Sequence, residues 1–325
     1  MLCALFVLLL LLLQVRNAFP LPVFDNFTLS DFAHKACSDN PRFGIDIGPS
    51  AAEKLASGKA SKGSKSAAPM LDPSTMPAIG ILRIDYTYPP ALGDAAHPNS
   101  YYYRTPHATV KGLTFEAAQA GGPLTSSQRN AMAQAISDLE GQDGVMGIAG
   151  DCGFMMHYQR EARALCKVPC FISSLLQASM LVSLFADDEY ILVLTANGPA
   201  LQPHLPQLLR ECGVVSQAAQ KRFIIAGCEA LPGFEAVALG QKVNVSKVQP
   251  HVVKLVQEQA KRQPKIRAVL LECTELPPYA DAIREATNLP VLDSITLVDF
   301  FHAGISENPY FGIDWKKLAS TPAFT

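Results

Sequence analysis

Two cysteines, Cys152 and Cys273, stand in matching sequence surroundings. Each follows a short apolar run, residues 145–149 for the first and 269–271 for the second, and such runs predict buried strands that end at the cysteines. A thiol near a helix N-terminus or another donor ionises easily, and a thiolate can remove a proton from a carbon acid. Two thiols on opposite sides of one cleft can therefore deprotonate one face of a substrate and protonate the other. The same pair supports elimination where the carbon β to a carboxylate carries a leaving group.

Strand and helix patterns alternate along the chain. We predict strands at 78–84, 145–149, 168–174, 191–198, 223–228, 269–272 and 290–294, and helices at 125–139, 155–165, 175–186, 201–211, 248–262, 280–287 and 295–303. This alternation predicts an α/β fold with parallel sheets flanked by helices. Because the pattern restarts at Tyr190, we expect two pseudo-symmetric lobes with the active site in the cleft between them. The first lobe would comprise residues 77–188 with 293–325, and the second residues 189–292.

Small polar residues lie where these strands are predicted to end. Ligands of parallel sheets bind at the carboxyl ends of the strands, so we expect Ser173, Thr195, Asn197 and Thr274 to bind a substrate carboxylate through hydroxyl, amide and backbone donors. The alternative for these residue types is ordinary turn and capping chemistry. Gly153, beside the first cysteine, would let a substrate approach the backbone.

The composition excludes several classes of protein. The chain has 325 residues, 49% of them hydrophobic and 17% charged, which is enough for two domains with a large core. A formal net charge of −2 argues against nucleic acid as a partner. Cys166 and Cys170 are four apart, but Pro169 separates them and no histidine cluster completes a site, so we expect buried structural thiols and no metal. Nucleotide-binding and zinc motifs are absent from the sequence, so the sequence gives no support for a nucleotide or zinc site.

The N-terminal region has the composition of a targeting segment. Residues 1–18 form a signal-like leader whose apolar run, 2–13, is short for a membrane span. Residues 19–76 form a transit-like flexible segment that is rich in Ala, Ser, Lys and Gly between 50 and 69. Ala-Phe-Pro at 18–20 resembles the phenylalanine that follows signal cleavage in proteins bound for complex algal plastids. We expect a plastid location, with secretion through the same leader as the alternative.

The motifs around the cysteines resemble a known superfamily. Gly-Asp-Cys-Gly at 150–153 and Glu-Cys-Thr-Glu-Leu-Pro-Pro-Tyr at 272–279 resemble the paired cysteine motifs of the aspartate/glutamate racemase superfamily. The Phe-Met-Met after the first cysteine, Thr-Ala-Asn-Gly at 195–198 and Gly-Cys-Glu at 227–229 further resemble algal dimethylsulfoniopropionate lyases. The resemblance covers about residues 78–303. It implies a cofactor-independent lyase that forms dimethyl sulfide and acrylate, with Cys152 and Cys273 as the catalytic residues, and a homotetramer.

The implied substrate is a small molecule with a carboxylate at one end and a sulfonium at the other. Removing the proton beside the carboxylate expels neutral dimethyl sulfide, so one base suffices. A sulfonium is a soft cation that aromatic rings can hold, and Tyr86, Tyr88 and Phe154 lie near predicted strand ends. Two alternatives stay open: an amino-acid or hydantoin racemase that uses the same two cysteines, and an inactive binding paralogue. Release of dimethyl sulfide and acrylate, against loss of optical rotation of aspartate or glutamate, separates lyase from racemase.

Overall fold

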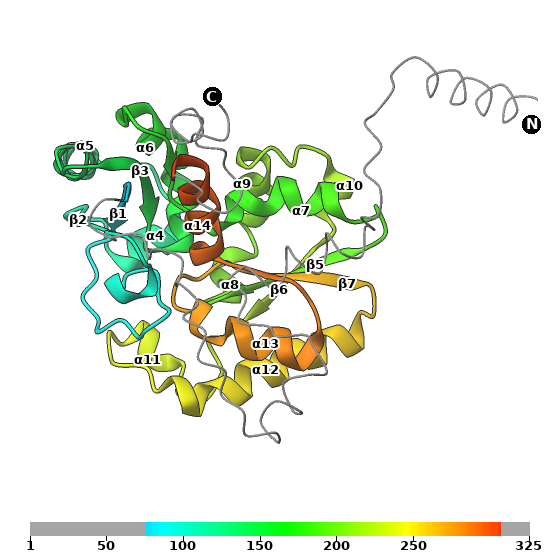
Figure 1. The fold of residues 1–325 in the computed structure, drawn as a ribbon. Coiled ribbons are helices and arrows are strands. Elements are labelled where there is room, and N and C mark those ends of the chain that lie inside the picture. The colour runs from blue at the N-terminus through cyan, green and yellow to red at the C-terminus, as the bar shows by residue number, and fades with distance from the viewer. Residues whose placement is uncertain (1–75, 307–325) are drawn as a thin grey trace, which may run out of the picture. The chain divides into compact units, whose positions relative to one another are not determined.

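Two four-stranded parallel sheets organise the protein in a computed structural model that describes residues 76–306 (Figure 1). The first sheet contains β1 (Ala78–Arg83), β2 (His107–Thr109), β3 (Val145–Gly150) and β4 (Cys170–Phe171), in the order β2-β1-β3-β4. The second contains β5 (Tyr190–Thr195), β6 (Phe223–Gly227), β7 (Ile266–Leu271) and β8 (Val291–Leu292), in the order β6-β5-β7-β8. The two sheets therefore repeat one strand order, and the prediction of two similar α/β lobes is confirmed.

Helices cover these sheets. The α-helices are α4 (Phe115–Ala120), α5 (Ser126–Glu140), α6 (Gln159–Leu165), α7 (Ala178–Leu184), α8 (Gly198–Leu201), α9 (Leu205–Glu211), α10 (Gln217–Gln220), α11 (Glu235–Ala238), α12 (Val245–Arg262), α13 (Ala280–Thr287) and α14 (Ser294–Ile305). Short 3-10 helices are η1 (Pro98–Ser100), η2 (Gly153–Tyr158), η3 (Ser174–Gln177) and η4 (Pro277–Tyr279). None of the helices between residues 76 and 306 is long and apolar enough to cross a membrane.

Side chains along the central strands point alternately to the two faces of the sheet, and this decides which helices they contact. In the second sheet, Ile191 and Val193 share a core with α7 and α9, whereas Leu192 and Leu194 share a core with α12 and α13. Figure 1 shows these two helix pairs on opposite sides of the sheet. Successive strand residues point to opposite faces, so a strand covered on both sides is apolar throughout. This explains the continuous apolar runs of the sequence.

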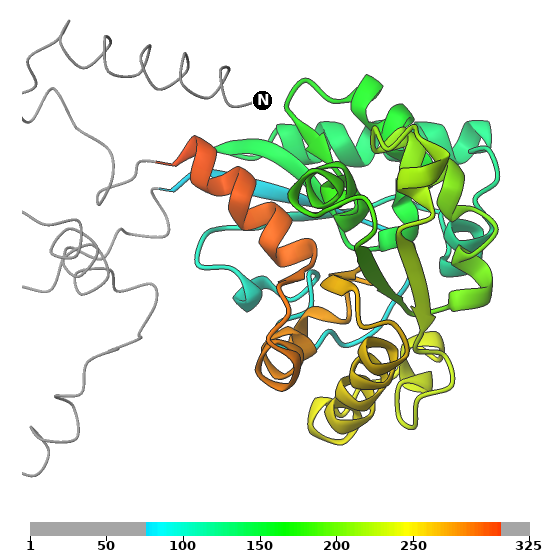
Figure 2. The same cartoon turned by 90° about the vertical axis from the view of Figure 1, so that its right-hand side faces the viewer.

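The first sheet is covered in the same manner. Leu82 of β1 packs with α5, and Ile81 packs on the other face with Val298 of α14. Figure 2 shows α14, the last helix of the described chain, alongside the strands of the first sheet. The residues that close the first core thus come from both ends of the described chain. The leader-like residues 1–18 and the transit-like segment up to residue 75 lie outside the described residues, and the predicted lobe boundaries stay predictions.

Local capping explains which predicted helices form as expected. Helix α5 begins with a capping box in which the Thr125 hydroxyl accepts from the Gln128 backbone N–H and the Gln128 side chain accepts from the Thr125 N–H. Three predicted helices are divided instead. The one expected at 155–165 starts as η2 and continues as α6, and the one at 175–186 starts as η3 and continues as α7. The one at 201–211 is split into α8 and α9 ahead of Pro206.

Candidate active site

The two cysteines occupy equivalent places at the ends of equivalent strands. Strand β3 ends at Gly150 and strand β7 ends at Leu271, so each cysteine lies two residues after the last residue of its strand. The two strand ends are paired in the same way, Gly150 with Leu82 of β1 and Leu271 with Leu194 of β5. Cys152 is 6% exposed and Cys273 is 8% exposed. The strand-end setting predicted for both cysteines is confirmed.

The two cysteines line one pocket. The pocket is narrow, with a cavity volume of about 10 Å³, which is room for about one water molecule. Its lining comprises Ile84, Tyr86, Tyr88, Phe115, Asp151, Cys152, Gly153, Phe154, Ala196, Glu272, Cys273, Thr274 and Glu275. Side chains of both lobes therefore meet around one narrow pocket.

Three of the predicted binding residues line this pocket, namely Tyr86, Gly153 and Thr274. Gly153 is required where it stands, because a Cβ at this position would overlap both the backbone carbonyl and the carboxyl of Glu272. The Tyr86 hydroxyl donates to the carbonyl of Val237 in α11, which ties the loop after β1 to the second lobe. Its ring remains available as part of the pocket wall.

The other three predicted binding residues are not in the pocket lining, and their polar groups bond within the protein. The Ser173 hydroxyl donates to the Gly153 carbonyl at 2.8 Å. Asn197 caps α8 by accepting from the Ala200 N–H, and its amide donates to Gln119. Thr195 is fully buried at the end of β5. These residues follow the turn and capping alternative, and they support the loops around the pocket without lining it.

The two strand ends are fastened to each other. The Thr274 hydroxyl donates to the Asp151 carbonyl, and the Ser174 hydroxyl donates to the Leu271 carbonyl at 2.8 Å. In addition, the Ala95 N–H donates to the Thr274 carbonyl at 3.1 Å. Each of these bonds joins segments far apart in sequence, so they hold the two cysteine turns in a fixed relation.

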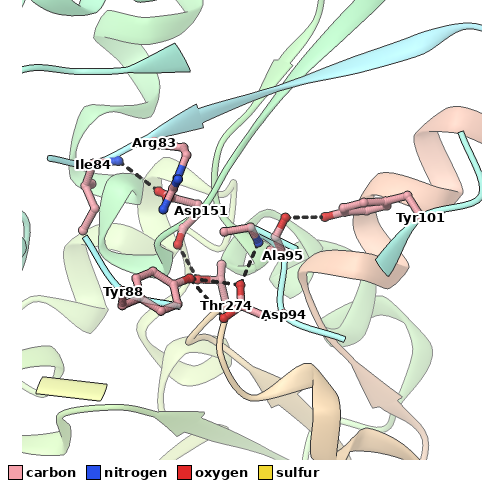
Figure 3. A network of polar contacts seen from close by, with 9 residues as sticks. Arg83, Ile84, Tyr88, Asp94, Ala95, Tyr101, Asp151 and Thr274 are labelled. Atoms are coloured by element: carbon pink, nitrogen blue, oxygen red, sulfur yellow. Dashed lines mark hydrogen bonds and ion pairs between the residues drawn. The ribbon is translucent and has the colours of Figure 1, made fainter. Parts of the chain in front are cut away.

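A polar network borders the pocket (Figure 3). The Asp151 carboxylate pairs with the Arg83 guanidinium, Nε to Oδ2, at 2.9 Å and accepts the Ile84 N–H at 2.9 Å. The Tyr88 hydroxyl donates to the Asp94 carboxylate at 3.0 Å. Burial raises the pKa of Asp151 to about 6, with Arg83 opposing the rise, and raises the pKa of Asp94 to about 7.

The surroundings of both pocket thiols favour their protonated form. Burial is the largest cause that raises the pKa of Cys152 and of Cys273 well above the usual value, and the carboxylates of Glu272 and Glu275 raise both pKa values further. A backbone N–H two residues on, from Phe154 or Glu275, donates to each sulfur and lowers its pKa. The easily ionised thiol expected at a strand end is thus not found, because desolvation outweighs these donors.

Two acids beside Cys273 were given no place among the predicted site residues. Burial raises the pKa of Glu272 to about 7, opposed by the nearby Thr195 hydroxyl, and raises the pKa of Glu275 to about 9, with Asp94 adding to that rise. The sequence signal for both acids was their position on either side of Cys273-Thr274. Phe115 was also missed, because the short helix α4 that carries it was not predicted.

No group of three or more His, Cys, Asp or Glu side chains within residues 76–306 could hold a metal ion. Cys166 and Cys170 are half-buried rather than buried, and a hydrogen bond between their thiols lowers the pKa of Cys166.

Comparison with known proteins places the chain in a family. Residues 94–298 match the family model described as Asp/Glu/Hydantoin racemase. Dimethylsulfoniopropionate lyase 5 of Emiliania huxleyi is 52% identical over 308 residues, which cover 94% of this chain and 59% of that protein. The dimethylsulfoniopropionate lyase of Durusdinium sp. clade D is 39% identical over 251 residues, which cover 77% of this chain and 82% of that protein.

Solved structures with a similar arrangement share little sequence. An aspartate racemase of Picrophilus torridus has a TM-score of 0.45 and 16% identity, covering 71% of this chain and 95% of that one. Unliganded arylmalonate decarboxylase has a TM-score of 0.44 and 15% identity, covering 72% and 97%. The chain belongs to the Asp/Glu/hydantoin racemase family, in the branch whose members are named dimethylsulfoniopropionate lyases. It spans 59% of the length of lyase 5 and 65% of the length of lyase 6 from Emiliania huxleyi.

Proposed function

We propose that the protein is a cofactor-independent carbon–sulfur lyase that cleaves dimethylsulfoniopropionate to dimethyl sulfide and acrylate. The names of its relatives support this proposal. The observation that carries it is the pocket, which brings together two thiols, an aromatic wall and three carboxyls, with no basic side chain in its lining. Such a pocket suits a substrate with a cationic end and an acidic C–H bond.

The reaction needs one base. A thiolate removes the proton from the carbon beside the substrate carboxylate, and the C–H electron pair becomes the double bond of acrylate. The C–S bond breaks and its electron pair leaves on sulfur, so the sulfonium departs as neutral dimethyl sulfide. The captured proton passes from the thiol to solvent before the next turnover. In this scheme one of Cys152 and Cys273 abstracts the proton, while the other lines the opposite wall and stabilises the developing enolate-like charge.

The substrate itself supplies the charge that activates the thiols. Glu272 and Glu275 raise both thiol pKa values, because they add negative charge to a buried site. A bound sulfonium places a positive charge in the same space, which offsets those carboxylates and lowers the thiol pKa. Ionisation would then accompany binding, and the resting thiols would stay protonated and less exposed to oxidation.

The test is the release of dimethyl sulfide into the headspace, with acrylate measured in solution, when the purified full chain is incubated with dimethylsulfoniopropionate. Equal amounts of both products are expected, and the Cys152→Ser variant should form both at least about 100-fold more slowly. The twin thiols on two walls also fit a racemase, so loss of optical rotation of aspartate or glutamate without dimethyl sulfide release would replace the lyase by a racemase. Thiol labelling without turnover of any carbon acid would indicate a binding paralogue.

We further propose that the protein acts in the plastid and assembles as a homotetramer. The leader-like residues 1–18 and the acid-poor segment that follows support the location. The tetramer follows from the resemblance alone, and sedimentation of the purified chain tests it.

A further inference from the structure

The pocket gathers acidic side chains without a basic side chain of its own. Its lining includes the carboxyls of Asp151, Glu272 and Glu275, and none of the lining residues is Lys, Arg or His. A buried carboxylate is costly unless a cation or hydrogen-bond donors accompany it. The three acids differ in whether a cation or a hydrogen-bond donor of the protein contacts their carboxyl groups.

Asp151 has its partners within the protein, since it pairs with Arg83 and accepts the Ile84 N–H. Glu272 has no hydrogen-bond partner of good geometry. Its side chain is fully buried, and neither carboxyl oxygen has a hydrogen-bond partner among the described residues. The Glu275 carboxyl is partly buried and forms no hydrogen bond or ion pair within residues 76–306. Two uncompensated carboxyls thus share one pocket, and one of them is completely removed from solvent.

Aromatic rings line the same pocket as these carboxyls. Tyr86 stacks on Phe115 with ring centroids 5.1 Å apart, and its centroid lies 5.7 Å from that of Tyr88. Glu275 lines the same pocket as these two tyrosines and both thiols. Aromatic faces next to a carboxylate form the surroundings that bind onium ions. Glu275 holds its proton in the empty pocket near neutral pH, so a bound cation would displace that proton and leave the carboxylate beside it.

We propose that the Glu275 carboxylate is the counterion of the substrate sulfonium, and that it makes the pocket select a cationic headgroup over a neutral one of the same shape. The inference rests on the proposed function for the identity of the sulfonium substrate. Glu272, deeper in the pocket, adds negative potential from below, and the rings of Tyr86 and Phe115 contact the methyl groups. Orienting the sulfonium toward Glu275 leaves the carboxylate end of the substrate toward the cysteine turns.

The test is a comparison of two ligands that do not need turnover. One is β-alanine betaine, whose trimethylammonium group replaces the dimethylsulfonium. The other is its neutral-headed isostere, in which carbon replaces the nitrogen. Calorimetric titration of the full chain should show at least about tenfold tighter binding of the betaine, since one tenfold step is the scale of a partly buried charge contact.

The Glu275→Gln variant should lose most of that preference, with the two dissociation constants approaching each other. Glu275→Asp keeps the charge and should keep part of the preference. Glu285→Gln, an exposed position on α13, is the matched control and should behave as the parent protein. An unchanged preference in Glu275→Gln, or no preference in the parent protein, overturns the counterion role.

The outcome is separable from that of the lyase assay. A betaine preference that depends on Glu275, in a protein that releases no dimethyl sulfide, would support the cation site and reject the lyase. Dimethyl sulfide release with a Glu275→Gln variant that still discriminates the two ligands would support the lyase and reject the counterion.

Discussion

Replacing Arg83 by Met should destabilise the protein by an amount that depends on pH. Arg83 is 23% exposed at its side chain and Asp151 is 1% exposed, so the substitution leaves a buried carboxylate without its cation. Breaking a buried ion pair by removing one partner costs about 3–5 kcal/mol. Since Arg83 is partly exposed, we expect a loss of about 3 kcal/mol in the free energy of unfolding at pH 8, where Asp151 is ionised in the parent protein.

The loss should be smaller at pH 5. Burial raises the pKa of Asp151 to about 6, above its ordinary value of 3.8, so at pH 5 the carboxyl is already largely protonated in the folded parent protein. Removing Arg83 then costs the hydrogen bond and packing of its side chain, about 1 kcal/mol. A raised carboxyl pKa also means that the folded state binds this proton more tightly than the unfolded chain. The contribution of Asp151 to stability is therefore largest at low pH and declines as the pH rises towards and past 6.

Urea unfolding followed by circular dichroism at pH 5 and pH 8 measures both values. Arg267→Met is the matched control: its ion pair with Glu189 is more exposed, so it should cost less than about 1 kcal/mol at either pH. Adding Asp151→Asn to Arg83→Met removes the ionisable group and should abolish the extra loss at pH 8. An equal loss at both pH values, or a larger one at pH 5, would refute the reasoning.

Three other predictions follow from the site and the sequence. Cys152→Ser and Cys273→Ser should each lower turnover at least about 100-fold, since a hydroxyl stays protonated where a thiol ionises. The control Cys228→Ser should leave dimethyl sulfide release nearly unchanged. A folded variant of either pocket cysteine that keeps most of its activity would contradict the two-thiol scheme. Burial raises the pKa of Glu275 to about 9 from 4.5, so the folded protein holds a proton on Glu275 that the unfolded chain releases. The melting temperature should therefore decline between pH 6 and pH 10, and Glu275→Gln should flatten this decline. A decline as steep as in the parent protein would show that Glu275 does not contribute to it. A fusion of residues 1–76 to a fluorescent protein should enter the plastid, and fluorescence found only outside the cell would reject this location.

The sequence was sufficient for the features that depend on local patterns. Apolar runs ending at the two cysteines located β3 and β7, and the capped amphipathic run at 125–139 located α5 within one residue at each end. Both are short-range signals: a strand buried on two faces must be apolar throughout, and a capping box satisfies backbone donors three residues away. The repetition of these signals in two halves was also enough to predict two similar lobes.

Only the tertiary structure decided which polar groups reach the pocket. Ser173 and Asn197 stand at strand ends as predicted, yet their side chains bond to Gly153 and to residues of α8 and α4, because partners distant in sequence satisfy them first. Nothing local marks Phe115 as a pocket residue, since a six-residue helix gives a weak pattern and its place depends on the loop after β1. The ionisation of the thiols was likewise decided by burial among Glu272 and Glu275, because desolvation and buried charge belong to the assembled site rather than to any single segment.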